Sequence, residues 1–312
     1  MYKIFRSIIK LILPTLSNLF LLLKVNRRVI NYLEDKSFSS NNNYNFKNEI
    51  KILLKDRKIF ALDIGAQGGF NSDEFFHNKY KSFFEPIMVE PIPKEADKLK
   101  KNYKYVIGKG IWSSNIKKKL FILGNRLGSS SIYEPSESNL KMYGYNSKEL
   151  KNFKITETVE IKCDTIDNSL EDLNIKKIDY LKIDTQGSEL EILKGMKKYN
   201  PILIRIEVQI FSAYKNVPRW TELLSFLTSR DYILCDWKKI GDHVSRTPVE
   251  MEMLFIPNFK SSFGKKIILD NKEKFLSLMM IFGQIKFLQL ISEELDLDEK
   301  NFLNKYEDRY FY

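Results

Sequence analysis

From about Lys51 onward, short apolar runs alternate with stretches in which apolar residues recur at helical spacing. Such runs are typical of strands buried on both faces, and helices between them connect parallel neighbours. The pattern predicts a mostly parallel sheet with helices on both faces. The expected strands are Ile59–Ile64, Pro86–Val89, Tyr105–Ile111, Val159–Lys162, Ile178–Ile183, Ile202–Val208 and Tyr232–Trp237.

The last expected strand, Met251–Pro257, follows Tyr232–Trp237 through a loop at Gly241–Pro248. This loop is too short for a crossover helix, so the two strands should be antiparallel. The predicted fold class is therefore α/β: a doubly wound, Rossmann-like sheet, mostly parallel, with a C-terminal antiparallel hairpin. That combination is the pattern of class I methyltransferases.

Both ends of the chain differ from this central part, which gives three predicted segments: 1–50, 51–260 and 261–312. Residues 1–35 are apolar with basic flanks, but Lys10 and Pro14 interrupt the apolar run, which argues against a membrane-spanning helix. A helix docked on the enzyme and a helix at an anionic membrane surface remain open. The C-terminal helical segment, Phe275 to Ile291, could pack on the first segment, mediate a homo-oligomer or contact a membrane.

Composition narrows the classes of partner and compartment. The net charge is +11, but the lysines are spread along the chain without zinc-finger spacing or an RNP-like aromatic run, which disfavours nucleic acid. Cys163 and Cys235 lie far apart in apolar stretches and should be reduced thiols, as in a cytoplasmic protein. The sequence leaves open whether the protein contacts the inner face of the membrane. His77 and His243 are too few for a histidine-based metal site, and no metal is expected.

A glycine-rich turn follows the first strand. Gly65, Gly68 and Gly69 suit a backbone that turns sharply and lies close to a ligand. Asp63 stands two residues before the first glycine, where its carboxylate would repel a diphosphate. The spacing also differs from that of dinucleotide-binding loops. Together these features favour a ligand with a positive amino group and a sulfonium.

Two more acids follow predicted strands. Glu90 comes directly after the second strand, about twenty residues past the glycines, where an acid can accept hydrogen bonds from ribose hydroxyls. Asp184 ends a central strand beside the crevice where ligands bind in open α/β sheets. Ser188 and Glu191, just beyond, predict a capping box for the next helix.

At these positions the chain resembles the FkbM-type methyltransferases between about Phe60 and Trp237. The resemblance rests on Leu62–Gly69, Val89–Pro91, Gly128–Ser131, Cys163–Asp167, Ile183–Glu189 with Leu193–Gly195, and Ile206–Glu207. Gln67 and Gln186 depart from the commoner Asn and Glu.

The resemblance implies S-adenosylmethionine as methyl donor and O-methyl transfer to a sugar, glycan or secondary-metabolite hydroxyl. It implies cofactor contacts from Asp63, Gly65 and Glu90. Ile111, Trp112 and Ser113, which follow the third strand, are expected near the adenine.

Methyl transfer to a hydroxyl requires alignment of the reacting atoms and a group that accepts the proton. We nominate Asp184 as a contact to the substrate or the methionine part, and Glu207 as the base. The alternative for Glu207 is a salt bridge to Arg205 or to a nearby lysine. Glu189 lies in a first helical turn, where an acid is favoured regardless of catalysis. The aromatic segment 124–153 is either a substrate lid or a packed surface excursion.

Two other functions remain open on the sequence. One is a nicotinamide-dependent oxidoreductase, which the spacing of the glycine-rich turn disfavours. The other is a non-catalytic scaffold subunit that retains a methyltransferase fold.

Overall fold

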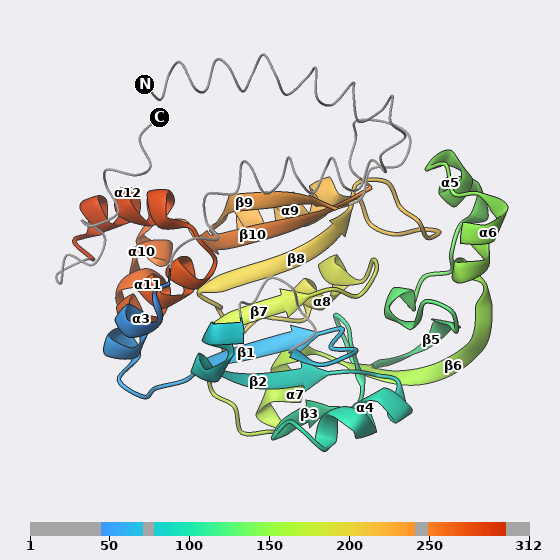
Figure 1. Ribbon diagram of the computed structural model, residues 1–312, viewed down its shortest axis with the longest axis horizontal. Helices are drawn as coiled ribbons and strands as arrows, with labels where there is room; N and C mark the ends of the chain where they lie inside the picture. The colour runs from blue at the N-terminus through green and yellow to red at the C-terminus, as the bar shows by residue number, and fades with distance from the viewer. Residues whose placement is uncertain (1–44, 71–77, 241–248, 298–312) are drawn as a thin grey trace, which may run out of the picture.

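The computed structural model describes residues 45–70, 78–240 and 249–297, and the structural statements below concern those residues. A seven-stranded sheet runs through the centre of the molecule (Figure 1). In spatial order its strands are β3 (Tyr105–Ile107), β2 (Phe84–Val89), β1 (Ile59–Ile64), β7 (Tyr180–Ile183), β8 (Leu203–Gln209), β10 (Glu250–Pro257) and β9 (Tyr232–Ile240).

The first five strands of this order pair in parallel, and β10 runs antiparallel to both β8 and β9. The predicted mostly parallel sheet with a C-terminal antiparallel hairpin is thereby confirmed. The carboxyl ends of β1, β2, β7 and β8 consequently lie along one edge of the sheet.

A second sheet of three strands stands beside this edge. It consists of β4 (Gly110–Ile111), β6 (Ile155–Asp164) and β5 (Ile116–Leu123), with β6 in the middle, parallel to β4 and antiparallel to β5. Two expectations about single strands were therefore wrong. Tyr105–Ile111 is divided between the two sheets, and Val159–Lys162 belongs to the small sheet.

Helices cover both faces of the large sheet. Leu62 and Ile64 of β1 point into a core shared with α7 (Ile166–Glu171), α8 (Glu189–Lys194) and α9 (Trp220–Ser229). Ala61, which alternates with them along the strand, lies in a separate core with α3 (Lys47–Leu54), α10 (Ser262–Leu269), α11 (Lys272–Ile281) and α12 (Ile285–Leu295). The continuous apolar run of β1 reflects burial on both sides.

The C-terminal helices supply much of the second core, since Phe275 and Leu278 of α11 are fully buried and α11 packs against α3. Figure 1 shows these helices together at one end of the sheet, opposite the small sheet. The predicted helical segment Phe275–Ile291 is confirmed as α11 and α12, which separate at Gly283.

The remaining elements are connections. They are η3 (Asn78–Phe83), α4 (Pro93–Lys100), η4 (Leu127–Ser129), α5 (Glu137–Met142), α6 (Ser147–Leu150) and η5 (Lys151–Phe153). No helix in the described part of the chain is long and apolar enough to cross a membrane. The predictions for residues 1–35 and for the loop Gly241–Pro248 fall outside the described residues.

Candidate active site

A cavity lies at the carboxyl ends of β1, β2 and β7, and the small sheet forms its opposite wall. Its empty volume of about 640 Å³, open mouth included, falls in the range of small-molecule sites. The lining is mainly apolar, and none of the described residues in it is a lysine or arginine. Polar groups come from the loop after β1, from Glu90 and from the turn after β7. The apolar lining is Ile64, Val89, Pro91, Ile92, Ile111, Leu120, Leu127, Ile132, Ile161 and Ile192.

Gly65 allows the turn after β1 to lie directly against the end of β7. Its φ is +85°, and a Cβ atom there would stand 1.8 Å from the carbonyl oxygen of Asp184. The amide of Gly65 donates to the carbonyl of Val89 (3.2 Å), which ties the turn to β2 as well. Only glycine satisfies both the dihedral angle and the space, as the sequence predicted.

The other two glycines of this turn support the loop from outside the cavity. Gly68 and Gly69 both have positive φ, and neither lines the cavity. A Cβ atom on Gly69 would stand 2.8 Å from the hydroxyl of Tyr103.

Asp63 is buried next to the cavity but does not line it. Its Oδ1 lies 3.2 Å from Nζ of Lys182 on the neighbouring strand β7. Lys182 also lies 3.9 Å from Asp184. The carboxylate expected to face a cationic ligand is thus partly neutralised by a lysine.

Glu90 lines the cavity at the end of β2. The amide of Ile92 donates to its Oε1 (2.8 Å), which holds the side chain in place. Burial raises the pKa of Glu90 from 4.5 to about 7, partly offset by the hydrogen bond from Ile92. Glu90 and Asp184 are the two acids in the described lining, and the ribose-binding role expected of Glu90 stays a prediction.

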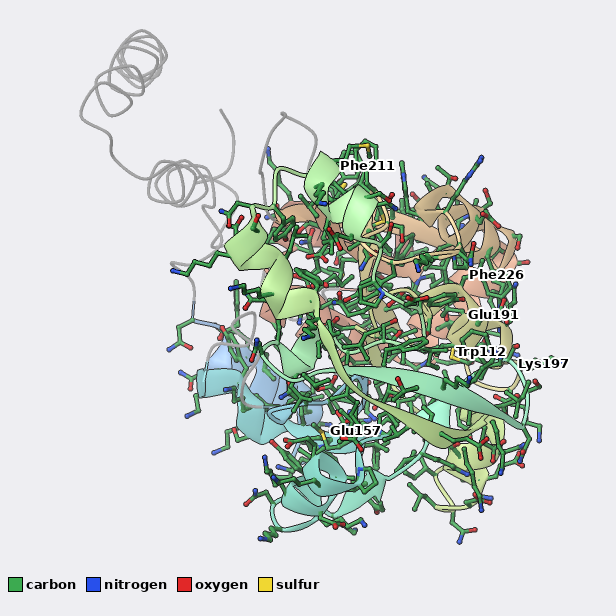
Figure 2. The ribbon with its side chains drawn as sticks, turned by 90° about the vertical axis from the view of Figure 1, so that its right-hand side faces the viewer. Trp112, Glu157, Glu191, Lys197, Phe211 and Phe226 are labelled. Atoms are coloured by element: carbon green, nitrogen blue, oxygen red, sulfur yellow. The ribbon has the colours of Figure 1, made fainter. Side chains whose placement is uncertain are left out.

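The three residues expected near the adenine are separated by the structure. Ile111 lines the cavity, whereas Trp112 packs in the core of the small sheet beneath Lys118. Ser113 donates to Glu191 (2.8 Å), away from the cavity lining, and Figure 2 shows Trp112 and Glu191 close together. Glu191 therefore does not form the predicted capping box, because the hydroxyl of Ser188 makes no cap hydrogen bond.

Glu189 shapes the turn between β7 and α8. Its Oε1 accepts hydrogen bonds from the amides of Thr185 and Gly187 and from the Thr185 hydroxyl, each 3.0 Å long. The side chain is buried, and desolvation raises its pKa. Glu189 thus holds the turn that presents Asp184 and Gln186, which is more than the helix-dipole role considered from sequence.

Gln186 links the two nominated catalytic acids. Its Nε2 donates to Asp184 (3.1 Å) and to Glu207 (2.8 Å). Its Oε1 accepts from Gln209 and from the hydroxyl of Tyr214, both at 3.3 Å. With a φ of +58°, Gln186 sits in a left-handed conformation that costs energy for a residue with a side chain. The structure brings Asp184 and Glu207 together through this amide.

Glu207 is half-buried near the end of β8. Arg205 pairs with Glu252 of the neighbouring strand β10, and this pair does not favour the alternative of a salt bridge from Arg205 to Glu207. Desolvation, followed by the charges of Asp184 and Glu250, raises the pKa of Glu207 well above its usual value. A carboxyl group with a raised pKa is a better proton acceptor for an alcohol than an exposed one.

The segment Gly128–Ser131 is hydrogen-bonded to the turn after β7 and to the loop after β8. The Ser131 hydroxyl donates to the Gln186 carbonyl (2.8 Å), and the Tyr214 hydroxyl donates to the Ser129 carbonyl (2.6 Å). Gly128 and Ser131 both line the cavity. In the sequence, Gly128–Ser131 stood out only as part of the family resemblance, and nothing there identified Gln209, Tyr214 or Glu250.

Within the described residues, no group of three His, Cys, Asp or Glu side chains is arranged to hold a metal ion. A family model described as the methyltransferase FkbM domain matches residues 63–234, more than half of the chain. A search of curated proteins gives no match.

Proposed function

The chain belongs to the FkbM methyltransferase family, and from this premise we propose that it is an S-adenosylmethionine-dependent O-methyltransferase. The observation that carries the proposal is an apolar cavity at the strand ends with carboxyl groups at Glu90 and Asp184 and no basic side chain in its described lining. The strand order, with β10 inserted antiparallel between β8 and β9, supports a class I methyltransferase fold.

The residues present fit an adenosyl group. Glu90 would accept hydrogen bonds from the ribose hydroxyls, and Ile111, Leu120 and Ile161 offer apolar surface for the base. Gly65 lines the cavity without a side chain, so the ligand would lie against its backbone. When bound, the cofactor supplies a methyl group on a positively charged sulfur.

The acids at the other side of the turn would accept the acceptor's proton. In the proposal Glu207 is the base, and Gln186 orients it against Asp184. Burial of Glu207 makes its carboxylate more basic, so that it can take up the proton as the oxygen attacks the methyl carbon. The acceptor is a hydroxyl of a sugar, glycan or secondary metabolite in this proposal.

A nicotinamide cofactor fits the same cavity less well. Its diphosphate would need cationic or amide donors, and the described lining offers two carboxyl groups and no lysine or arginine. Because Lys182 partly neutralises Asp63, discrimination against a diphosphate rests on Glu90 and Asp184 more than on Asp63.

Calorimetry with S-adenosylhomocysteine and with NAD tests the proposal. We expect binding of the first and none of the second. Glu90→Ala should weaken S-adenosylhomocysteine binding roughly 10- to 100-fold, because the ribose hydroxyls lose a charged acceptor. Glu85→Ala, at the other end of β2, is the matched control and should leave affinity unchanged. Binding of NAD alone would refute the proposal.

A further inference from the structure

Three acids beyond the cofactor cavity lie on one face of the large sheet. On β8, Glu207 and Gln209 stand opposite Glu252 and Glu250 of the antiparallel strand β10. Residues that face each other across an antiparallel pair project to the same side of the sheet. Glu250 is therefore a diagonal neighbour of Glu207, on the side where the acceptor must reach the proposed base.

Tyr143 brings a second polar group to the same place. It follows α5, the residue is 7% exposed, and its hydroxyl has no hydrogen-bond partner among the residues that the structure describes. The Tyr143 ring packs on Phe211, two residues beyond Gln209, and Gln209 faces Glu250 across the β8–β10 pair, so Tyr143 and Glu250 lie in the same region. Burial and then the charge of Glu250 raise the pKa of Tyr143, in agreement with this placement. Leaving a buried hydroxyl without a hydrogen bond costs free energy, which points to a ligand that supplies the missing hydrogen bond.

No hydrogen bond joins the Glu250 carboxyl group to another described residue. Burial, followed by the charge of Asp184, raises its pKa to about 7. The Tyr143 hydroxyl therefore offers a hydrogen-bond donor and the Glu250 carboxylate offers an acceptor.

We propose that Tyr143 and Glu250 hold a second hydroxyl of the acceptor, close to the hydroxyl that is methylated at Glu207. A hydroxyl both donates and accepts a hydrogen bond, so the Tyr143 O–H and a Glu250 oxygen together satisfy it. The site then selects polyhydroxylated acceptors over molecules with a single hydroxyl. This inference rests on the proposed methyltransferase function and adds the feature by which the acceptor is chosen.

Apolar side chains beside this pair suit the carbon framework of such an acceptor. Phe211, two residues past β8, is 43% exposed and packs edge to face on Tyr143 with ring centroids 5.5 Å apart. Met142 is 63% exposed next to it. Figure 2 looks onto this region and shows Phe211 beside the helices of the segment 124–153. An exposed aromatic ring can stack on the apolar face of a cyclic polyol.

The test measures methyl transfer from S-adenosylmethionine to a panel of methyl pyranosides, to their analogues lacking one neighbouring hydroxyl, and to cyclohexanol. The wild-type protein should prefer an intact pyranoside. Tyr143→Phe should raise KM for that acceptor about 10-fold, as expected for one lost hydrogen bond, with kcat unchanged. For the deoxy analogue, the same substitution should change KM less than twofold, because the second hydroxyl is already absent.

Glu250→Met serves as a second variant, because methionine keeps the length of the side chain but removes the carboxylate acceptor. It should also raise KM for the intact pyranoside more than for the analogue. Tyr145→Phe, which removes a hydroxyl from the same segment, is the control and should leave KM unchanged. Equal losses on both acceptors, a wild-type preference for cyclohexanol, or no pyranoside methylated by a protein that binds S-adenosylhomocysteine would overturn the inference. Absence of S-adenosylhomocysteine binding would instead refute the methyltransferase proposal itself.

Discussion

Replacing Gly65 by alanine tests how the cofactor cavity is built. The new Cβ atom would stand 1.8 Å from the Asp184 carbonyl oxygen, whereas a carbon and an oxygen in contact normally lie about 3.3 Å or more apart. The turn after β1 must therefore move about 1.5 Å away from β7. The φ of +85° adds a cost of roughly 1–2 kcal/mol for a residue with a Cβ atom.

These two effects should cost about 3 kcal/mol in total, shared between folding and ligand binding. We expect Gly65→Ala to weaken S-adenosylhomocysteine binding at least about 100-fold in calorimetry and to lower the midpoint of thermal unfolding by several degrees. The loss of affinity should exceed what the unfolded fraction explains, because the shifted turn is part of the cavity wall.

Gly108→Ala is the matched control. Its Cβ atom would meet Ala96 at 3.8 Å, an ordinary contact, and its φ needs no glycine. This variant should bind S-adenosylhomocysteine like the wild type. If Gly65→Ala binds with unchanged affinity while remaining folded, the close approach of β1 and β7 does not shape the site and the reasoning is wrong.

Two further predictions concern buried carboxyl groups. All three hydrogen bonds from the turn are accepted by Oε1 of Glu189. Because Glu189→Gln keeps one such oxygen, it should change the free energy of unfolding by less than about 1 kcal/mol. Glu189→Ala should lower the free energy of unfolding by roughly 3 kcal/mol, as measured in denaturant titrations. Equal effects of the two variants would contradict this account of the turn. Because the pKa of Glu90 is raised to about 7, its carboxylate forms only as pH rises past that value, and S-adenosylhomocysteine affinity should increase between about pH 6 and pH 8. Because this pKa is raised on folding, the contribution of Glu90 to stability falls as pH rises from about 4.5 to 7. Glu90→Gln should therefore be more stable relative to the wild type at the higher pH, and its affinity for S-adenosylhomocysteine should not rise with pH. A wild-type affinity independent of pH would contradict the prediction.

Local pattern determined the elements that lie wholly within the large sheet. The apolar run Ile59–Ile64 is a strand with those bounds, and the short loop before Met251–Pro257 was enough to predict an antiparallel pair. The glycine-rich turn and Glu90 could also be predicted from the sequence. A tight turn requires backbone angles that favour glycine, and a residue directly after a parallel strand lies at the edge of the sheet where ligands bind. These features depend on neighbours in sequence, which is why sequence alone suffices for them.

Tertiary structure decided where the side chains of the site point. Asp63 alternates with Leu62 and Ile64 on β1, so it faces Lys182 rather than the cavity, a pairing of residues 119 positions apart. The small sheet that closes the cavity forms from strands whose apolar content is weak, such as the lysine-rich β5. Gln186, Gln209, Tyr214 and Glu250 come together only because the turn after β7, the strands β8 and β10 and the loop after β8 converge, and no local spacing encodes this arrangement. The sequence predicted acids at the ends of neighbouring strands, but the hydrogen bonds that connect Asp184 and Glu207 through Gln186 follow from long-range packing.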